Sequence, residues 1–155
     1  MRPNRTSNLT QIGFFLIPQF SMLSMSAAVE PLRIANRLSQ RILYEWSFYS
    51  QDGLPVRASN DIEVATTRDM ADTEGLDALI VVAGIEVKDH DDPTLSKWLR
   101  GLSRQSITLG STSTGSLLLA RAKLLNQSPC TIHWENIDSF KEEFPLLNIT
   151  GELYE

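Results

Sequence analysis

A serine-rich turn between two apolar segments is the part of this sequence best suited to chemistry. Residues 107–112 form an apolar, β-branched run and residues 114–122 have helical character, so Ser113 falls at the turn between an expected strand and an expected helix. Such a turn pushes its residue out of the sheet beside free backbone N–H groups, where a nucleophile often sits. Alternatively, Ser111, Ser113 and Thr114 cap the helix, because their hydroxyls accept bonds from its first N–H groups.

His133 is the candidate base for this serine. It follows a short strand expected at residues 130–132, and a base at a neighbouring strand end could take the proton of Ser113. The other histidine, His90, lies in an acidic loop. A lone histidine is more often structural, and the competing interpretation has His133 bonded locally and Trp134 packed in the core.

Other polar and reactive residues carry weaker signals. Gly84 follows a buried strand and could offer its backbone N–H to an oxyanion or carboxylate, although a plain turn explains it equally well. Cys130 has apolar neighbours, which indicates an inert core cysteine. The acidic residues 89–92 lack the ligand spacing of a calcium loop. We therefore expect no metal and no cofactor.

Strands and helices must alternate to position these residues. The sequence predicts an α/β fold, a three-layer sandwich with a flavodoxin-like, mostly parallel sheet and helices on both faces. Ligands bind such sheets beyond the carboxyl ends of the strands. Strands are expected at 11–17, 44–50, 77–83, 107–112, 130–132 and 147–150, a hairpin at 56–65, and helices at 21–38, from Pro93 through Leu102, at 114–122 and at 135–144, with Pro31 kinking or restarting the first.

Composition narrows the possible functions. A chain of 155 residues fits one domain over 11–155, after a disordered tail over 1–10. A net charge of −5 argues against this chain itself binding nucleic acid. The arginines at 33, 37 and 41 are expected to form a solvated face, with contact to an anion as the alternative. A single cysteine fits a reducing, cytoplasmic compartment. The apolar run 12–17 is too short for a signal peptide or a membrane span.

Several strings of the sequence occur together in a known family. They are Glu30-Pro31-Leu32-Arg33-Ile34-Ala35-Asn36, Val81-Val82-Ala83-Gly84, the turn at 110–120 and Thr131-Ile132-His133-Trp134-Glu135. In this order they resemble the N-terminal sensor domain of AraC-type transcription regulators, a PfpI-like domain with the class I glutamine amidotransferase-like fold. The resemblance covers essentially the whole chain.

The resemblance also implies which residues line the site. Enzymes of that superfamily use a cysteine, a histidine and an acid, and these positions fall here on Ser113, His133 and Ser24, while the second glycine of a Gly-Gly turn falls on Ile85. A serine without an oriented base is a poor nucleophile, so we expect no catalysis. The implied ligand-binding set is Ser24, Glu30, Gly84, Ile85, Ser113, Thr114 and His133.

The predicted function is a non-catalytic sensing and dimerisation domain of an AraC-type regulator. The resemblance implies a small polar effector, genes for the metabolism of amino acids or quaternary amines, a homodimer, and DNA contact only through a C-terminal helix-turn-helix domain outside this chain, which we expect to stop before the last sensor helix. The alternatives are a hydrolase or amidotransferase-like enzyme using Ser113 and His133, and a pure dimerisation module. A carboxylate within hydrogen-bond reach of His133 would favour the enzyme.

Overall fold

A four-stranded parallel sheet forms the centre of the molecule. The structure is a computed structural model that describes residues 9–125 and 128–155. The strand order is β2-β1-β5-β6, with β1 (Thr10–Leu16), β2 (Tyr44–Tyr49), β5 (Ala78–Val82) and β6 (Thr108–Thr112). The other elements are the antiparallel pair β3 (Val56–Arg57) and β4 (Glu63–Val64), the helices α1 (Met22–Ser39), α2 (Pro93–Arg104), α3 (Ser116–Arg121) and α4 (Ile137–Glu143), and the 3-10 turns η1 (Val87–His90), η2 (Ser113–Gly115) and η3 (Trp134–Asn136).

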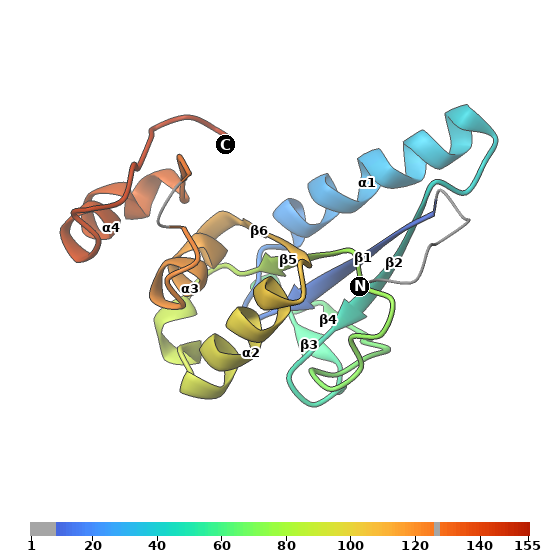
Figure 1. Ribbon diagram of the computed structural model, residues 1–155, viewed down its shortest axis with the longest axis horizontal. Helices are drawn as coiled ribbons and strands as arrows, with labels where there is room; N and C mark the ends of the chain where they lie inside the picture. The colour runs from blue at the N-terminus through green and yellow to red at the C-terminus, as the bar shows by residue number, and fades with distance from the viewer. Residues whose placement is uncertain (1–8, 126–127) are drawn as a thin grey trace.

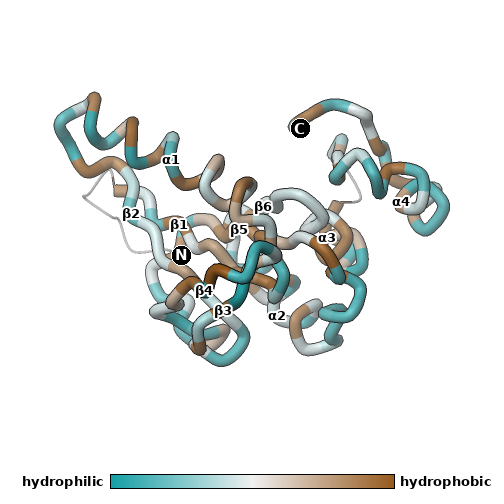
Figure 2. Tube along the Cα trace, turned by 180° about the vertical axis from the view of Figure 1, so that it is seen from behind, coloured by the Kyte–Doolittle hydropathy of each residue, from teal (hydrophilic) through white to brown (hydrophobic). Residues whose placement is uncertain are grey.

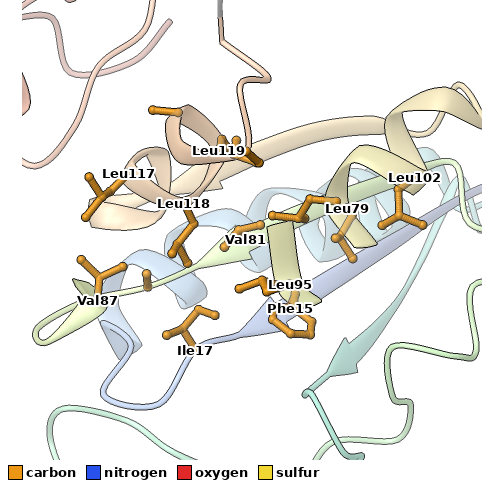
Figure 3. Close-up of a cluster of buried hydrophobic side chains, with 14 of the residues drawn as sticks. Phe15, Ile17, Leu79, Val81, Val87, Leu95, Leu102, Leu117, Leu118 and Leu119 are labelled. Atoms are coloured by element: carbon orange, nitrogen blue, oxygen red, sulfur yellow. The ribbon is translucent and has the colours of Figure 1, made fainter. Parts of the chain in front are cut away.

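Side chains alternate between two hydrophobic cores, one on each face of the sheet. Phe14 and Leu16 of β1 pack with Met25 of α1 on one face. Phe15 and Ile17 pack on the other face, in the core that α2 and α3 complete. Figure 3 shows this second core, and Figure 1 shows the helices on either side of the sheet. Because successive side chains of a strand point to opposite faces, the unbroken apolar runs give the predicted three-layer α/β fold, which is confirmed.

The parallel register brings three strand ends to one edge of the sheet. Leu16 of β1 pairs with Val82 of β5, and Val82 pairs in turn with Thr112 of β6. The segments that follow these strands, beginning at Ile17, Ala83 and Ser113, therefore start side by side. This edge is where a ligand site is expected in a sheet of this type.

Helix α1 runs unbroken through Pro31. Ser21 caps it, its Oγ accepting from Ser24 N at 3.2 Å. Pro31 was expected either to kink the helix or to restart it. The restart is wrong, because Met22–Ser39 is one helix of 18 residues. Proline removes the N–H that would have bonded Ala27 O, and Ala27 is exposed, so water can satisfy that carbonyl.

Helix α2 follows the sequence prediction closely. Asp92 Oδ1 accepts from Thr94 N at 2.7 Å, and Pro93 is the first helical residue. Leu95, Leu99 and Leu102 are the buried residues of α2. The cap, the first-turn proline and the apolar spacing are local signals, which explains why they could be interpreted from sequence.

The two short strands expected near the C-terminus do not form, so that prediction is wrong. Residues 130–132 and 147–150 form only an isolated bridge between Cys130 and Ile149. Cys130 N donates to Asn148 O at 3.0 Å and Thr150 N donates to Cys130 O at 2.9 Å. The pairing stops there because the chain turns toward β6, where His133 N donates to Ser113 O at 3.2 Å.

At the other end of the chain, β1 begins at Thr10, inside the range expected as a tail. Residues 1–8 of that expected tail lie outside the described residues. Across 9–125 and 128–155, the structure contains no helix with the length and hydrophobicity needed to cross a membrane.

Candidate functional site

Ser113 occupies a strained turn between β6 and η2. Its φ is 56°, in the left-handed region that residues other than glycine seldom adopt, and the preceding Thr112 is extended with φ −123° and ψ 152°. A single left-handed residue reverses the chain out of the sheet and directly into a helical turn. Strain of this kind costs about 1–3 kcal/mol and clusters at functional sites. The predicted strand-to-helix elbow at Ser113 is confirmed.

The residues around the elbow explain how it tolerates Ser111 where a glycine would be expected. A Cβ added to Gly115 would lie 2.6 Å from Val81 O, so the start of α3 rests directly on β5. The same added Cβ would lie 3.0 Å from the Ser111 Cβ, a tight but possible approach. The Ser111 hydroxyl is 3.0 Å from that of Ser116 and forms a hydrogen bond with it. Glycine is therefore needed at 115, whereas a small polar residue fits at 111.

Ser24 lies beside the elbow, as the resemblance implied. Its Oγ donates to Ser21 O at 3.0 Å and is 3.2 Å from Thr112 Oγ1, the last side chain of β6. This contact joins the first turn of α1 to the residue before Ser113 across 88 positions of sequence. A hydroxyl here supplies hydrogen bonds but no negative charge, so it cannot stabilise a protonated base as a carboxylate would.

Gly84 and Thr114 connect the elbow to the loop after β5. Thr114 Oγ1 donates to Gly84 O at 2.5 Å, and Thr114 is buried. A Cβ on Gly84 would lie 2.3 Å from Gln19 O and 2.8 Å from Ser21 N, so glycine is required by the close passage of the loop after β1. Both residues thus have a structural role here, and the following Ile85 is 56% exposed.

The backbone of His133 is fixed next to Ser113, but its side chain is half-exposed. His133 N donates to Ser113 O at 3.2 Å. The imidazole Nδ1 lies 3.7 Å from Glu135 Oε2, which is close enough for an ion pair but too long for a hydrogen bond. His133 does not end a strand of the sheet, since residues 130–132 form only the isolated bridge. The carboxylate that approaches His133 within the described part of the chain therefore does not complete a triad.

Trp134 was misjudged from the sequence. One interpretation of the sequence packed Trp134 in the core. Its side chain is instead 74% exposed, and its ring centroid lies 5.7 Å from that of His133. Exposed tryptophans at polar sites contact ligands through the ring face. A usable signal was present, because Trp134 lies between His133 and Glu135 and lacks the apolar neighbours of a core position.

Glu30 is placed away from the elbow contacts. It lies on the outer side of α1 and accepts a hydrogen bond from Arg33 Nε at 2.9 Å. This bond lowers the pKa of the Glu30 carboxyl. Glu30 and the other predicted ligand residues do not form one contact network, which instead joins Ser24 to Thr112, Gly84 to Thr114 and Ser113 to His133.

A small cavity lies beside the elbow, and a larger hollow lies elsewhere on the domain. A cavity of about 10 Å³, room for about one water molecule, lies under it between Thr114, Leu117 and Phe140. A larger hollow of about 670 Å³ follows the edge of β2, and its lining includes Trp46 and Arg68 but none of the predicted site residues. A ligand larger than one water molecule would therefore not fit in the cavity under the elbow.

The sequence is similar to bacterial transcription regulators. No protein-family model matches the chain. It is 46% identical over 142 residues to the HTH-type transcriptional regulator CdhR of Pseudomonas aeruginosa, a match covering 92% of this chain and 42% of that protein. The chain thus spans less than half the length of this relative.

Solved structures agree on the fold. An AraC family transcriptional regulator from Pseudomonas putida superposes with a TM-score of 0.82 at 29% identity, over 92% of this chain and 77% of that one. A ThiJ/PfpI family protein from Pseudomonas syringae superposes with a TM-score of 0.73 at 18% identity, over 92% and 57% of the two chains. The chain has the PfpI-like fold. This fold, together with the similarity to HTH-type and AraC family regulators, confirms the resemblance stated from the sequence.

Proposed function

We propose that this PfpI-like domain is the effector-sensing part of an AraC-type transcriptional regulator and has no catalytic activity of its own. The observation that carries the proposal is that the elbow has a strained geometry suited to a nucleophile, whereas the residues around it lack the groups that would activate Ser113. Ser113 and Ser24 carry hydroxyls where the related enzymes have a cysteine and an acid, and Glu135 Oε2 lies 3.7 Å from His133 Nδ1. A serine without an oriented base and acid gains little nucleophilicity. The similarity to CdhR supports the regulatory side of the proposal.

The effector is a small zwitterion of the amino-acid or betaine type. Ser113, which is partly exposed, and the His133 ring offer hydrogen bonds to a carboxylate. The exposed Trp134 ring and the Glu135 carboxylate beside it suit an ammonium group, which an aromatic face attracts. The ligand set is the one expected from sequence with Trp134 added: Ser24, Glu30, Gly84, Ile85, Ser113, Thr114, His133 and Trp134.

The whole protein acts in the cytoplasm as a homodimer. It contacts DNA through a helix-turn-helix domain outside the described chain and controls genes for the metabolism of amino acids or quaternary amines. Support comes from the relatives, which are named as HTH-type regulators and of which this chain spans 41–45% in the regulator matches. The effector shifts the domain between two states by binding one of them more tightly.

Titration calorimetry with a panel of amino acids and betaines tests the sensing site. We expect one class of compound to bind. Ser113→Trp, which places a bulky ring at the elbow, and Trp134→Ala, which removes the exposed ring, should each weaken binding at least about tenfold. Ser103→Trp on exposed α2 surface is the matched control and should bind normally. A ligand that both site variants bind as tightly as the wild type would place the site elsewhere.

The enzyme alternative deserves a direct assay because one relative is an enzyme. The chain is 29% identical to the isonitrile hydratase of Pseudomonas putida over 126 residues. We expect no turnover of isonitrile, ester or amide substrates above background by the wild-type chain. A reproducible rate that disappears in Ser113→Ala would overturn the non-catalytic proposal.

A further inference from the structure

The larger hollow lies at the margin of the sheet formed by β2. This strand is last in the sheet order on the side away from α3 and α4 (Figure 1), and Figure 2 shows the same margin from behind. The hollow of about 670 Å³ is lined by Gln11, near the start of β1, and by Tyr44, the first residue of β2. Ser113 instead follows the last residue of β6, at the opposite margin. The hollow is therefore separate from the elbow.

The outer edge of β2 is covered near both ends and open in its middle. At its start, the Asn36 side chain of α1 donates from Nδ2 to Tyr44 O at 2.8 Å and accepts from Tyr44 N at 3.1 Å. Near its end, Thr67 N donates to Phe48 O at 3.0 Å. Alternate residues of a strand direct their main-chain groups to the same side, so the N–H and carbonyl of Trp46 also point outward. Neither of these two groups has a hydrogen-bond partner in the described part of the chain.

These unpaired main-chain groups of Trp46 suit an extended segment of another chain. A sheet edge with free N–H and carbonyl groups pairs readily with such a segment, whose main chain completes the hydrogen bonds. Because Asn36 and Thr67 close the edge on either side of Trp46, only about three residues can pair there. The hollow is of the size that binds small ligands and short peptides. The edge therefore favours a short segment over a long added strand.

The two faces of β2 differ in the side chains that they offer. Trp46 packs against the core beneath α1, and a residue paired opposite it would lie on that same apolar face. Glu45 points to the other face, where its Oε2 accepts from Gln11 Nε2 at 2.6 Å. A segment paired here should therefore alternate, with an apolar side chain opposite Trp46 and polar side chains before and after it.

The charged side chains of the hollow favour a basic segment. Glu45 and Glu74 line it, and neither carboxylate has an ion pair within the described residues. Arg68 also lines it, but its guanidinium is already bound to Asp72 Oδ1 at 2.9 Å. Two carboxylates thus remain for cations. Pairs between exposed groups contribute little each, so charge selects the segment while the main-chain bonds hold it.

We propose that the hollow at β2 binds a short extended segment of a partner protein, with one apolar residue between two basic ones. The Trp46 N–H donates to the segment, the Trp46 carbonyl accepts from it, and Glu45 and Glu74 pair with the basic side chains. This goes beyond the proposed sensing function and does not depend on an effector at Ser113.

Fluorescence anisotropy with a labelled pentapeptide tests the proposal. The probe is fluorescein-labelled Thr-Lys-Val-Lys-Thr, the lysine probe, and we expect it to bind the wild-type chain saturably. The corresponding glutamate probe, Thr-Glu-Val-Glu-Thr, should bind at least about tenfold more weakly. A lysine probe N-methylated at valine and at the following lysine cannot donate to the Trp46 carbonyl in either direction of pairing, and it should also bind at least about tenfold more weakly. No saturable binding of the lysine probe, or equal binding of its methylated form, would overturn the proposal.

Charge reversal locates the contact. In the double variant Glu45→Lys/Glu74→Lys the preference should invert, so that the glutamate probe binds more tightly than the lysine probe. Glu142→Lys/Glu152→Lys changes the net charge equally at two exposed positions outside the hollow, and it should keep the wild-type preference. An unchanged preference in the first variant, or an inverted one in the second, would show that the segment does not bind at β2.

Two further measurements separate this site from effector sensing and from self-association. Ser113→Trp should bind the lysine probe as the wild type does, and weaker binding would place the probe at the elbow and overturn the proposal. Sedimentation should give the same oligomeric state with and without the probe. If the probe dissociates a dimer, then the edge binds a second copy of this chain and the proposal is wrong. A failure of calorimetry to detect an effector would overturn only the sensing site.

Discussion

The elbow and the segment that carries His133 meet at Ser113 but are held in different ways. The elbow is tied into the sheet by buried groups, with Thr114 bonded to Gly84 and Gly115 pressed against β5. The His133 segment is attached by one backbone bond to Ser113, through α4 by Arg121, and by the buried side chains of Ile132 and Phe140. The fold therefore fixes the position of Ser113 through buried backbone contacts, whereas the position of His133 depends on fewer contacts near the surface.

The two regions also differ in how many buried side chains hold their helices. Leu117, Leu118 and Leu119 fill the space between α3 and the sheet (Figure 3), whereas Phe140 is the buried residue of α4. Local opening requires the least energy where few buried contacts must be broken. We therefore expect the C-terminal segment to open before the sheet does.

The largest effect should come from breaking the elbow side. Gly84→Ala would place a Cβ 2.3 Å from the carbonyl oxygen of Gln19, and two backbone segments must separate to make room. We expect a loss of about 3 kcal/mol in the free energy of unfolding, measured by urea denaturation. Gly101→Ala, with nothing within 4 Å of the new Cβ and a helical backbone, should gain about 0.5–1 kcal/mol. An unchanged Gly84→Ala protein would contradict the close packing of the two loops.

The next effect concerns the attachment of α4. Arg121 bonds Glu143 of α4 at 2.8 Å and Asp91 at 3.0 Å, and the two acids raise the pKa of its guanidinium. Arg121→Met should cost about 1 kcal/mol, since the groups are only partly buried. That loss should fall mainly on the C-terminal segment.

Alkylation of the single, buried Cys130 reports the opening of this segment. A loss of about 1 kcal/mol should raise the labelling rate roughly fivefold in Arg121→Met. Arg57→Met, which removes only exposed pairs with Asp61 and Glu63, should leave the rate unchanged. Equal rates in both variants would show that Arg121 does not hold the segment.

A smaller effect of opposite sign is expected at the elbow. Ser113→Gly relieves the left-handed strain at φ 56° and should stabilise the domain by about 0.5–1 kcal/mol in urea denaturation. Ser103→Gly in α2 should destabilise it by a similar amount, because that backbone is helical. If Ser113→Gly is destabilising, then the serine side chain makes a contact that outweighs the strain.

The smallest effect is in the pH dependence of Cys130 labelling. Burial, and secondarily the charge of Glu155, raises the pKa of the Cys130 thiol. A raised folded-state pKa contributes stability below the unfolded pKa that is lost as pH rises through the folded value. The labelling rate of the native chain should therefore keep rising beyond the pH at which the urea-unfolded chain levels off. Coincident plateaus would show that Cys130 is not shielded.

Local signals predicted most of the fold and the centre of the site. The cap at Asp92, the apolar runs of β1, β5 and β6, and the elbow at Ser113 depend on residues within a few positions of each other, and the structure confirms them. The strand expected at 130–132 does not form, because a strand must pair with a neighbouring strand and the local sequence does not show whether one is present. The backbone of His133 is instead bonded to Ser113, twenty residues earlier.

By itself, the sequence determined the alternation of strands and helices, the strand-to-helix turn at Ser113, and the absence of a cysteine there. Tertiary structure alone decided that Ser24 contacts Thr112 and that Thr114 is held by Gly84. It also decided that α1 passes through Pro31. Periodicity and capping are set by neighbours along the chain, whereas contacts across 88 residues depend on how the layers pack.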